Sequence, residues 1–496
     1  MVLWIILGVI LIWLAIILIR AAMLKPDQDQ GCPLPNLEPI RADSSEVAER
    51  LAGMIRCRTV APASAEKAGE EEPGYDDFIK LRSLIKEFYP LTHEQLEHEV
   101  VNDHSLLYRW PGRSSDKPML LMAHYDVVPA DDRQWSKPPF GGMIEDGVLW
   151  GRGAIDTKIT FCAIFEAAEA LLATGFKPAQ DIYFAFGHDE ETMGTGAPAI
   201  VEVLKVRGIR PEMVLDEGGA IVNNIFPGVK EPIAVVGMAE KGVTDIEFVI
   251  EGPGGHSSTP GRVNPMGVMS RIILRVDKNP FRAHLPVEVR EMFSVLGRHM
   301  PFVFRIIFAN LWCFKPLLLA LLPLIGRELN ALCRTTCVFT MAEASSASNV
   351  IPDRVRTVAN LRLAAIDPIE SALKHLTDQA MIASKKAREG SDPLKLSVSV
   401  VKGHNASPSS STDSDAYRKL SGTIESVFRG TVVTPYIMLG ASDSRHFCAI
   451  SDNVMRFSPI KLSKEELRSI HGIDEKIAVE KIGKVVEFYT TLITRP

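Results

Sequence analysis

Histidine and carboxylate side chains that could hold metal ions stand at five places along the chain. They are His124 and Asp126 in AHYDVVP, Asp156 in GRGAIDTK, Glu190 and Glu191 in GHDEET, Asp216 in VLDEGG and His471 in HGIDE. Imidazoles and carboxylates without thiolates suit Zn²⁺ or a similar ion such as Co²⁺ or Mn²⁺. Two metal ions about 3.5 to 4 Å apart need one carboxylate that bridges them, and hydrolysis needs another that accepts a proton from water. The adjacent pair Glu190 and Glu191 can supply one ligand and one base.

Each of these residues on its own is weak evidence for a metal site. A single histidine is more often structural, and a short acidic run is usually a solvated turn. The order of the set carries the prediction. An HxD motif is followed by an aspartate about thirty residues later, then by a Glu-Glu pair, and then by an aspartate about twenty-five residues further on.

Short apolar runs precede several of these residues and are expected to be strands of one sheet. Residues 119–123, 182–186 and 213–215 are continuously apolar, which is typical of parallel strands covered on both faces. A helix is expected over 161–172. Alternating strands and helices predict an α/β fold with a mostly parallel sheet and helices on both faces. Ligands of such sheets bind beyond the carboxyl ends of the strands, where the metal-binding side chains could meet.

The pattern changes near residue 240, which predicts a second domain inserted into the first. Segments 41–240 and 405–496 have α/β patterning and would form the catalytic, metal-binding domain. Segment 241–404 would form a smaller α+β lid or dimerisation domain. Its expected elements are strands at 244–250, 335–342, 354–363 and 395–401 and helices at 265–276 and 368–385.

Residues 280–334 are expected to be an apolar elaboration of the inserted domain, because they contain the run FKPLLLALLPLI at 314–325. This run is too short to span a bilayer. One interpretation is a local core or a dimer contact. The other is a wall for an apolar substrate group, or a patch that dips into a membrane surface.

The first 25 residues are expected to form a transmembrane anchor. Residues 2–19 are an apolar run, and eighteen residues at about 1.5 Å each measure roughly 27 Å, just enough to cross a hydrocarbon core. A cleaved signal peptide is the alternative, although such peptides usually have a basic start and a shorter apolar core. Arg20 and Lys25 are too few to assign the side of the membrane. The Pro-rich residues 26–40 would be a tether.

Composition excludes several other classes of protein. The chain of 496 residues has 55 Lys+Arg against 61 Asp+Glu and a net charge of -6, which leaves no general basic surface for nucleic acid. A hydrophobic content of 46% argues against disorder. The seven cysteines form no CxxC pair, so neither a disulfide framework nor a thiolate zinc cluster is expected.

Taken together, HYDVVP, GRGAIDTK, GHDEET, LDEGG, GGHSS, NVIP, SDSRHF and HGIDE resemble the motifs of the aminoacylase/carboxypeptidase G/carboxypeptidase S metallopeptidases. The resemblance covers roughly residues 41–490. It is strongest to the branch of carboxypeptidase S and the N-fatty-acyl-amino-acid synthase/hydrolases. It implies a di-zinc exopeptidase fold, a homodimer and two divalent ions per chain, with Zn²⁺ expected and Co²⁺ or Mn²⁺ as alternatives.

The resemblance also implies how the metal ligands are divided. His124 and Asp216 would hold one ion, and Glu191 and His471 would hold the other. Asp156 would bridge the two ions.

The same resemblance implies the remaining roles. Glu190 would be the general base, and Asp126 would orient the neighbouring histidine through its other ring nitrogen. His256 in GPGGHSS would reach the active site of the partner subunit and stabilise the oxyanion, with Asn349 in NVIP nearby. Arg445 in SDSRHF would bind the free carboxylate of the substrate, because a guanidinium pairs bidentately with a carboxylate. The alternatives are a structural glycine-rich turn for His256 and a structural ion pair for Arg445.

The expected reaction is hydrolysis of an amide next to a free α-carboxylate. A peptide with a free C-terminus and an N-acyl amino acid both fit that description. The apolar elaboration and the anchor favour hydrophobic acyl groups, including long chains. The alternatives are a membrane-tethered binding protein that has lost catalysis and a metallohydrolase that acts on other amides.

Overall fold

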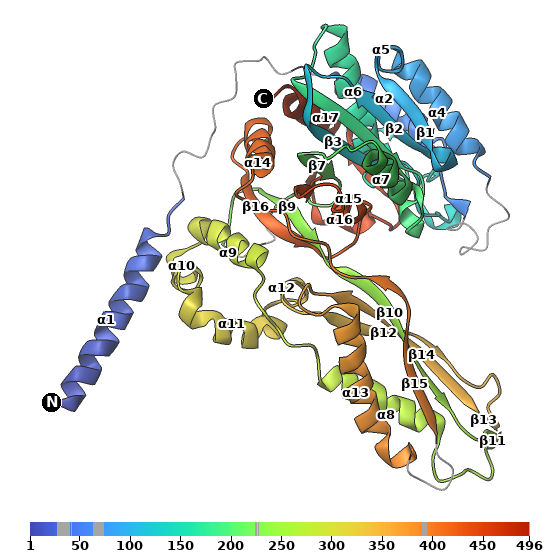
Figure 1. Ribbon diagram of the computed structural model, residues 1–496, viewed down its shortest axis with the longest axis vertical. Helices are drawn as coiled ribbons and strands as arrows, with labels where there is room; N and C mark the ends of the chain where they lie inside the picture. The colour runs from blue at the N-terminus through green and yellow to red at the C-terminus, as the bar shows by residue number, and fades with distance from the viewer. Residues whose placement is uncertain are drawn as a thin grey trace.

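The fold is taken from a computed structural model that describes residues 1–26, 40, 42–62, 74–223, 226, 228–388 and 394–495. Nearly all of the predicted tether over 26–40 lies outside these residues. The larger sheet with its helices and the smaller sheet with its helices lie at opposite ends of the body, and α1 projects from its side (Figure 1).

Ten strands form the larger sheet, and the three predicted from apolar runs are adjacent at its centre. In order, the strands are β1 (Glu97–Val101), β2 (Ser105–Trp110), β6 (Gln180–Gly187), β3 (Ser114–His124), β7 (Met213–Asp216), β17 (Val454–Arg456), β9 (Ile233–Glu240), β8 (Ile221–Val222) and β18 (Lys461–Leu462), with β16 (Val432–Met438) also paired to β9. The neighbours β6, β3, β7 and β17 run parallel, whereas β2 is antiparallel to both β1 and β6. A three-residue connection joins β1 to β2, and so short a link allows only an antiparallel pair. The sheet is therefore mixed, with a parallel centre.

The central strands are apolar throughout because both faces of the sheet are buried. Successive side chains of a strand point to opposite faces. Leu120 and Met122 of β3 pack in one cluster with α7 (Gly196–Val206), and Leu121 and Ala123 pack in a second cluster on the other face. That second face is covered by α2 (Ser44–Ile55), α6 (Lys158–Ala173) and α17 (Val479–Thr494), with α4 (Asp76–Phe88) against α2. The predicted α/β fold with helices on both faces is confirmed.

The smaller sheet contains the four strands predicted between residues 241 and 404. Its order is β12 (Thr336–Glu343), β14 (Arg354–Leu363), β10 (Gly242–Glu251) and β15 (Lys395–His404), all antiparallel. The helices α8 (Pro265–Lys278) and α13 (Ile369–Arg388) share a buried cluster with this sheet. The short pair β11 (Gly255–His256) and β13 (Val350–Ile351) lies at the end of the sheet that is remote from the larger sheet (Figure 1).

Smaller elements complete the body. They are α5 (Pro90–Gln95), β4 (Met143–Glu145), β5 (Val148–Trp150), α14 (Asp415–Val427), α15 (Ser444–Phe447), α16 (Lys464–Ser469) and β19 (Lys476–Ala478). The strands β4, β5 and β19 pair as a separate three-stranded sheet. Through it, the segment after α16 is joined to the segment that precedes α6.

The N-terminal helix α1 (Val2–Met23) is long and apolar enough to cross a membrane, and a signal sequence would meet the same criterion. It packs against α10 (Phe302–Phe308), one of the helices of the apolar elaboration (Figure 1). The others are α9 (Val287–His299), α11 (Leu311–Ile325) and α12 (Arg327–Leu332). The run predicted as apolar at 314–325 is helical, and α9 packs against β16 of the larger sheet.

Candidate metal centre

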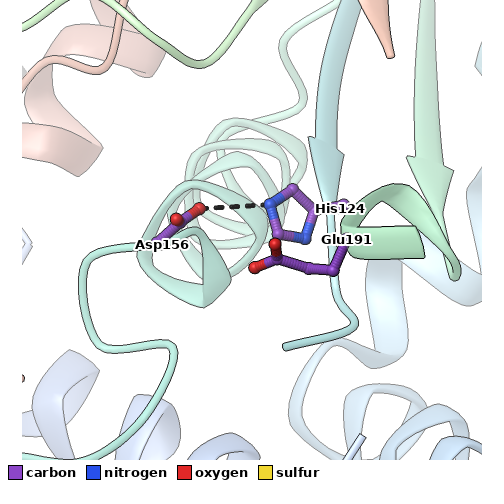
Figure 2. A group of neighbouring side chains, drawn as sticks. All are labelled: His124, Asp156 and Glu191. Carbon is purple, nitrogen blue, oxygen red and sulfur yellow. Dashed lines mark hydrogen bonds and ion pairs between the residues drawn. The ribbon is translucent and has the colours of Figure 1, made fainter. Parts of the chain in front are cut away.

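The parallel strands at the centre of the larger sheet bring several predicted side chains to one edge. His124 is the last residue of β3 and is paired in register with Gly187, the last residue of β6. Glu190 and Glu191 follow β6 in a single turn of 3₁₀-helix. The carboxyl ends of adjacent parallel strands meet at the same edge of a sheet, which is where α/β folds bind ligands. Figure 2 shows His124 with Glu191 and with Asp156, which comes from the loop before α6.

Asp156 lies between the two predicted imidazoles. Its Oδ1 is 3.2 Å from Nε2 of His124, and its Oδ2 is 3.0 Å from Nε2 of His471. Nε2 of His471 is also 3.1 Å from a carboxylate oxygen of Glu191. Each oxygen of Asp156 thus faces a different histidine, which is the arrangement required of a bridging ligand.

Two groups of side chains in the described part of the chain have the spacing of a metal site. One contains His124, Asp156 and Glu191, and the other contains His124, Glu190 and Glu217, with ligand atoms within 4.8 Å of one another in each group. An oxygen of Glu217 is 3.2 Å from Nε2 of His124. Glu217 is not among the ligands predicted from the sequence.

The structure does not bring Asp216, the predicted ligand, into either group. Asp216 is buried at the end of β7, and its carboxylate accepts the backbone N–H of Ser444 at 3.1 Å. The side chains of adjacent residues at the end of a strand point in different directions. Because the side chain of Glu217 is directed to His124, that of Asp216 is directed into the body of the protein. The motif VLDEGG contains both carboxylates side by side, and spacing alone could not choose between them.

Asp126 organises the side chains around it. Its backbone carbonyl is 3.0 Å from Nδ1 of His124, and its carboxylate oxygen Oδ1 is 3.3 Å from the same atom. The two carboxylate oxygens also accept the backbone N–H groups of Glu190 and Glu191, at 3.2 and 3.1 Å. This buried aspartate therefore orients the histidine and holds the Glu-Glu turn.

A buried ion pair between Glu475 and Arg152 connects the loop that contains Asp156 with the loop that contains His471. The carboxylate of Glu475 accepts the backbone N–H groups of Ile155 at 2.7 Å and of Asp156 at 3.1 Å. It also pairs with Arg152 at 2.8 Å, and Arg152 donates to the carbonyl oxygen of Gly472 at 2.7 Å. Glu475 lies in HGIDE, four residues after the predicted histidine ligand, but sequence analysis gave it no role.

The electrostatics of the site suit a bound cation. Burial raises the pKa of Glu217 to about 8 and raises the pKa values of Glu190 and Glu191 above their usual range. Several carboxylates thus share a buried space in which their negative charges are unfavourable. A divalent cation offsets that cost, and carboxylate and imidazole ligands suit such an ion.

Three further predicted residues lie outside the two groups. His256, on β11, is exposed and its Nδ1 is 2.7 Å from the hydroxyl of Ser258. Asn349 is its neighbour, because its carbonyl oxygen accepts the backbone N–H of Ser257 at 2.9 Å. Both lie at the far end of the smaller sheet, away from the carboxyl ends of β3 and β6 (Figure 1). The structure brings these two residues together but not to the metal-binding groups of their own chain.

Arg445 lies closer to the metal-binding groups. It is half-buried on α15, which contacts β7, and its guanidinium donates to the carbonyl oxygen of Ser442. Its neighbour Ser444 donates to Asp216, so α15 is attached to the end of β7.

Comparison with known proteins gives consistent results. Residues 120–495 match peptidase family M20/M25/M40. A probable carboxypeptidase S-like protein of Dictyostelium discoideum is 36% identical, over 90% of this chain and 84% of its own. An N-fatty-acyl-amino acid synthase/hydrolase of Xenopus tropicalis is 34% identical, over 91% of this chain and 86% of its own. The crystal structure of an M20 family metallo-carboxypeptidase from Sulfolobus solfataricus superposes with a TM-score of 0.64 over 90% of this chain and 98% of that one, and its 17% identity supports the fold alone.

Proposed function

This chain belongs to peptidase family M20/M25/M40 and is a metal-dependent hydrolase, and we propose that it cleaves an amide bond next to a free α-carboxylate, with N-acyl amino acids as its preferred substrates. The observation that carries the proposal is the position of Asp156 between His124 and His471. A carboxylate shared by two imidazole ligands supports a site for two metal ions.

The proposed ligands differ from the sequence-based set at one position. His124 and Glu217 would hold one ion, Glu191 and His471 would hold the other, and Asp156 would be shared by the two. Glu217 replaces Asp216 because its oxygen is 3.2 Å from the histidine nitrogen, whereas Asp216 accepts a backbone N–H. Zn²⁺ fits this set of nitrogen and oxygen ligands, as would Co²⁺ or Mn²⁺.

Two bound ions would polarise the scissile carbonyl and lower the pKa of the attacking water. Glu190 accepts the proton of that water and passes it to the leaving nitrogen. Asp126 keeps Glu190 in place through its backbone N–H.

The substrate carboxylate is assigned to Arg445, whose guanidinium is half-buried beside the end of β7. Two relatives support different acyl groups on the released amino acid, since one is named a carboxypeptidase S-like protein and the other an N-fatty-acyl-amino acid synthase/hydrolase. The exposed apolar side chains of α10 and α11 favour the second class, in which the acyl group is apolar.

His256 and Asn349 are proposed to complete the active site of a second copy in a homodimer. Their exposed position at the far end of the smaller sheet supports this role, because they are remote from the metal ligands of their own chain. A two-fold dimer is the commonest closed assembly. His256 would donate a hydrogen bond to the developing oxyanion.

The N-terminal helix α1 is proposed to be a membrane anchor that is retained in the mature protein. This helix of 22 residues is apolar over a length that can span a bilayer, and nearly all of that length is exposed rather than buried in the fold. Full-length protein should therefore remain in the membrane fraction after a high-salt wash, because an apolar span does not depend on surface charge.

A substrate panel tests the proposed function. Full-length protein loaded with Zn²⁺ should hydrolyse N-acyl amino acids and prefer long acyl chains to acetyl, with dipeptides and N-acyl amides as comparison substrates. Removal of the metal by a chelator should abolish the reaction and added Zn²⁺ should restore it. Faster hydrolysis of N-acyl amides that lack a carboxylate would contradict the proposal.

A further inference from the structure

The corner formed by α10 and α11 exposes an unusual number of apolar side chains. The exposed ones include Phe302 (45%), Val303 (69%), Trp312 (56%), Leu317 (56%) and Leu324 (83%). Between residues 302 and 325 the sequence contains Arg305 and Lys315 but no acidic residue. Clustered exposed apolar residues mark a binding surface, because single-domain surfaces rarely leave large apolar patches in water.

This corner is attached to α1 by specific polar contacts. The side-chain amide of Asn310, which is fully buried at the bend between α10 and α11, donates to the backbone carbonyl oxygen of Ile17 at 3.0 Å. The guanidinium of Arg20 donates to the carbonyl oxygen of Ala309 at 3.1 Å. Ile17 and Ala21, on this side of α1, are the buried residues of that helix.

These contacts place the corner beside the C-terminal end of α1. Ile17 is six residues before Met23, the end of α1, which is about 9 Å along a helix. Helices that lie in a membrane interface insert about 5 to 10 Å into the boundary between headgroups and acyl chains. If α1 crosses a bilayer, the last two turns of α1 and the α10–α11 corner would therefore lie in the same interfacial layer.

The polar groups of the corner are arranged as a membrane interface requires. Backbone groups without water must find partners within the protein. Arg20 donates to the carbonyl oxygen of Ala309 at the C-terminal end of α10, and Asn310 donates to a carbonyl oxygen within α1. The helices α10 and α11 are bent by 100° with respect to each other, and together they are apolar enough for a span that is broken or re-entrant. Lys315 can extend its ammonium toward headgroups.

We propose that the α10–α11 corner is a second membrane-contact surface, which inserts its exposed apolar side chains into the same bilayer leaflet that α1 enters. The proposal rests on α1 being a retained anchor. Two attachments on one side of the body fix its orientation on the bilayer, which a single helix followed by a tether would not do. The surface would also lie where amphiphilic substrates with long acyl chains gather.

The test measures the contact of single residues with lipid in the full-length protein. Cysteine variants Val303→Cys and Leu317→Cys report on the corner, and Ile10→Cys reports on α1. Val206→Cys, at the end of α7, is the matched control because its side chain is 85% exposed. Each variant is labelled with an environment-sensitive fluorophore and reconstituted in phosphatidylcholine nanodiscs with and without nitroxide-labelled lipid, and the signal from the unsubstituted chain is subtracted.

We expect nitroxide lipid to quench the labels at residues 10, 303 and 317 but not the label at residue 206. Quenching at residue 10 without quenching at 303 and 317 would overturn the proposal and leave the anchor intact. Absence of quenching at residue 10 would show that α1 is not a membrane anchor, and it would therefore also overturn the proposal. A third outcome is that the labels at 303 and 317 are not quenched by nitroxide lipid but have blue-shifted emission in a dimer. That outcome would instead assign this surface to a second copy of the chain.

Discussion

The carboxylate of Glu475 accepts the backbone N–H of Asp156 at 3.1 Å, although 319 residues separate the two in the sequence. Asp156 is the side chain that faces both imidazoles, so its position decides whether two ions can be held. Glu475 is buried, and its pairing with Arg152 links the loop of Asp156 to the loop that carries His471. This ion pair acts on the site through the backbone that carries the ligands.

Substitution Glu475→Gln should therefore weaken metal binding without removing a ligand. We expect affinity for Zn²⁺ to fall about 10- to 100-fold, as is usual when a group that supports metal ligands is changed. Competition with a chromophoric chelator measures the affinity, and thermal unfolding shows whether the variant is folded. Glu465→Gln, at an exposed position on α16, is the control that should keep full affinity. Equal affinities for both variants would show that Glu475 does not position Asp156.

The neighbours Asp216 and Glu217 should respond differently to removal of their charge. Glu217→Gln should weaken the binding of one of the two ions, because Glu217 faces His124. Asp216→Asn keeps an oxygen that can accept the N–H of Ser444 and should retain both ions. The metal content of the purified variants measures the difference. The opposite pattern would restore Asp216 as the ligand that sequence analysis predicts.

Arg445→Ala should reduce the preference for substrates with a free carboxylate. A guanidinium binds a carboxylate more strongly than an ester or amide, so kcat/KM should fall for the acid and change little for its methyl ester. The ratio of the two values is the measurement, and Arg468→Ala, on α16, is the control. An unchanged ratio would assign the carboxylate to a different residue.

Mixed dimers should reveal whether His256 acts in the partner subunit. Homodimers of His256→Ala and of Glu190→Gln should each be nearly inactive. Exchange of equal amounts makes about half of the dimers mixed, and each of these has one complete site, so activity should recover to about a quarter of wild type for a two-fold dimer. If mixing is verified by mass and activity does not recover, His256 does not act across the interface.

The sequence predicted the strands at the centre of the larger sheet because their neighbours bury both faces. The strands at 119–123 and 182–186 are buried on both faces, so nearly every residue in them is apolar. Their sequence therefore shows a continuous apolar run and no alternation of apolar and polar residues. The antiparallel edge was not predicted, since β1 is exposed and mixed in composition.

The metal ligands were predicted from their residue types and their order in the sequence, without knowledge of side-chain geometry. His124, Asp156, Glu191 and His471 come together as expected, because sheet topology brings strand ends and their loops to one edge. The choice between adjacent carboxylates at the end of β7 required side-chain direction. The role of Glu475 depends on backbone contacts made across the fold, which leave no local pattern in the sequence.

Two metal ions and Glu190 are proposed to perform the hydrolysis together. Glu190→Gln in the full-length protein, assayed for metal content and for hydrolysis of a long-chain N-acyl amino acid, tests this proposal most directly. We predict that the variant keeps two ions per chain and loses turnover by a factor on the order of 10² to 10⁴, as expected for loss of a general base. A variant that keeps near-normal turnover would show that Glu190 is not the base, and a wild-type protein that is fully active without metal would show that the reaction does not need the ions.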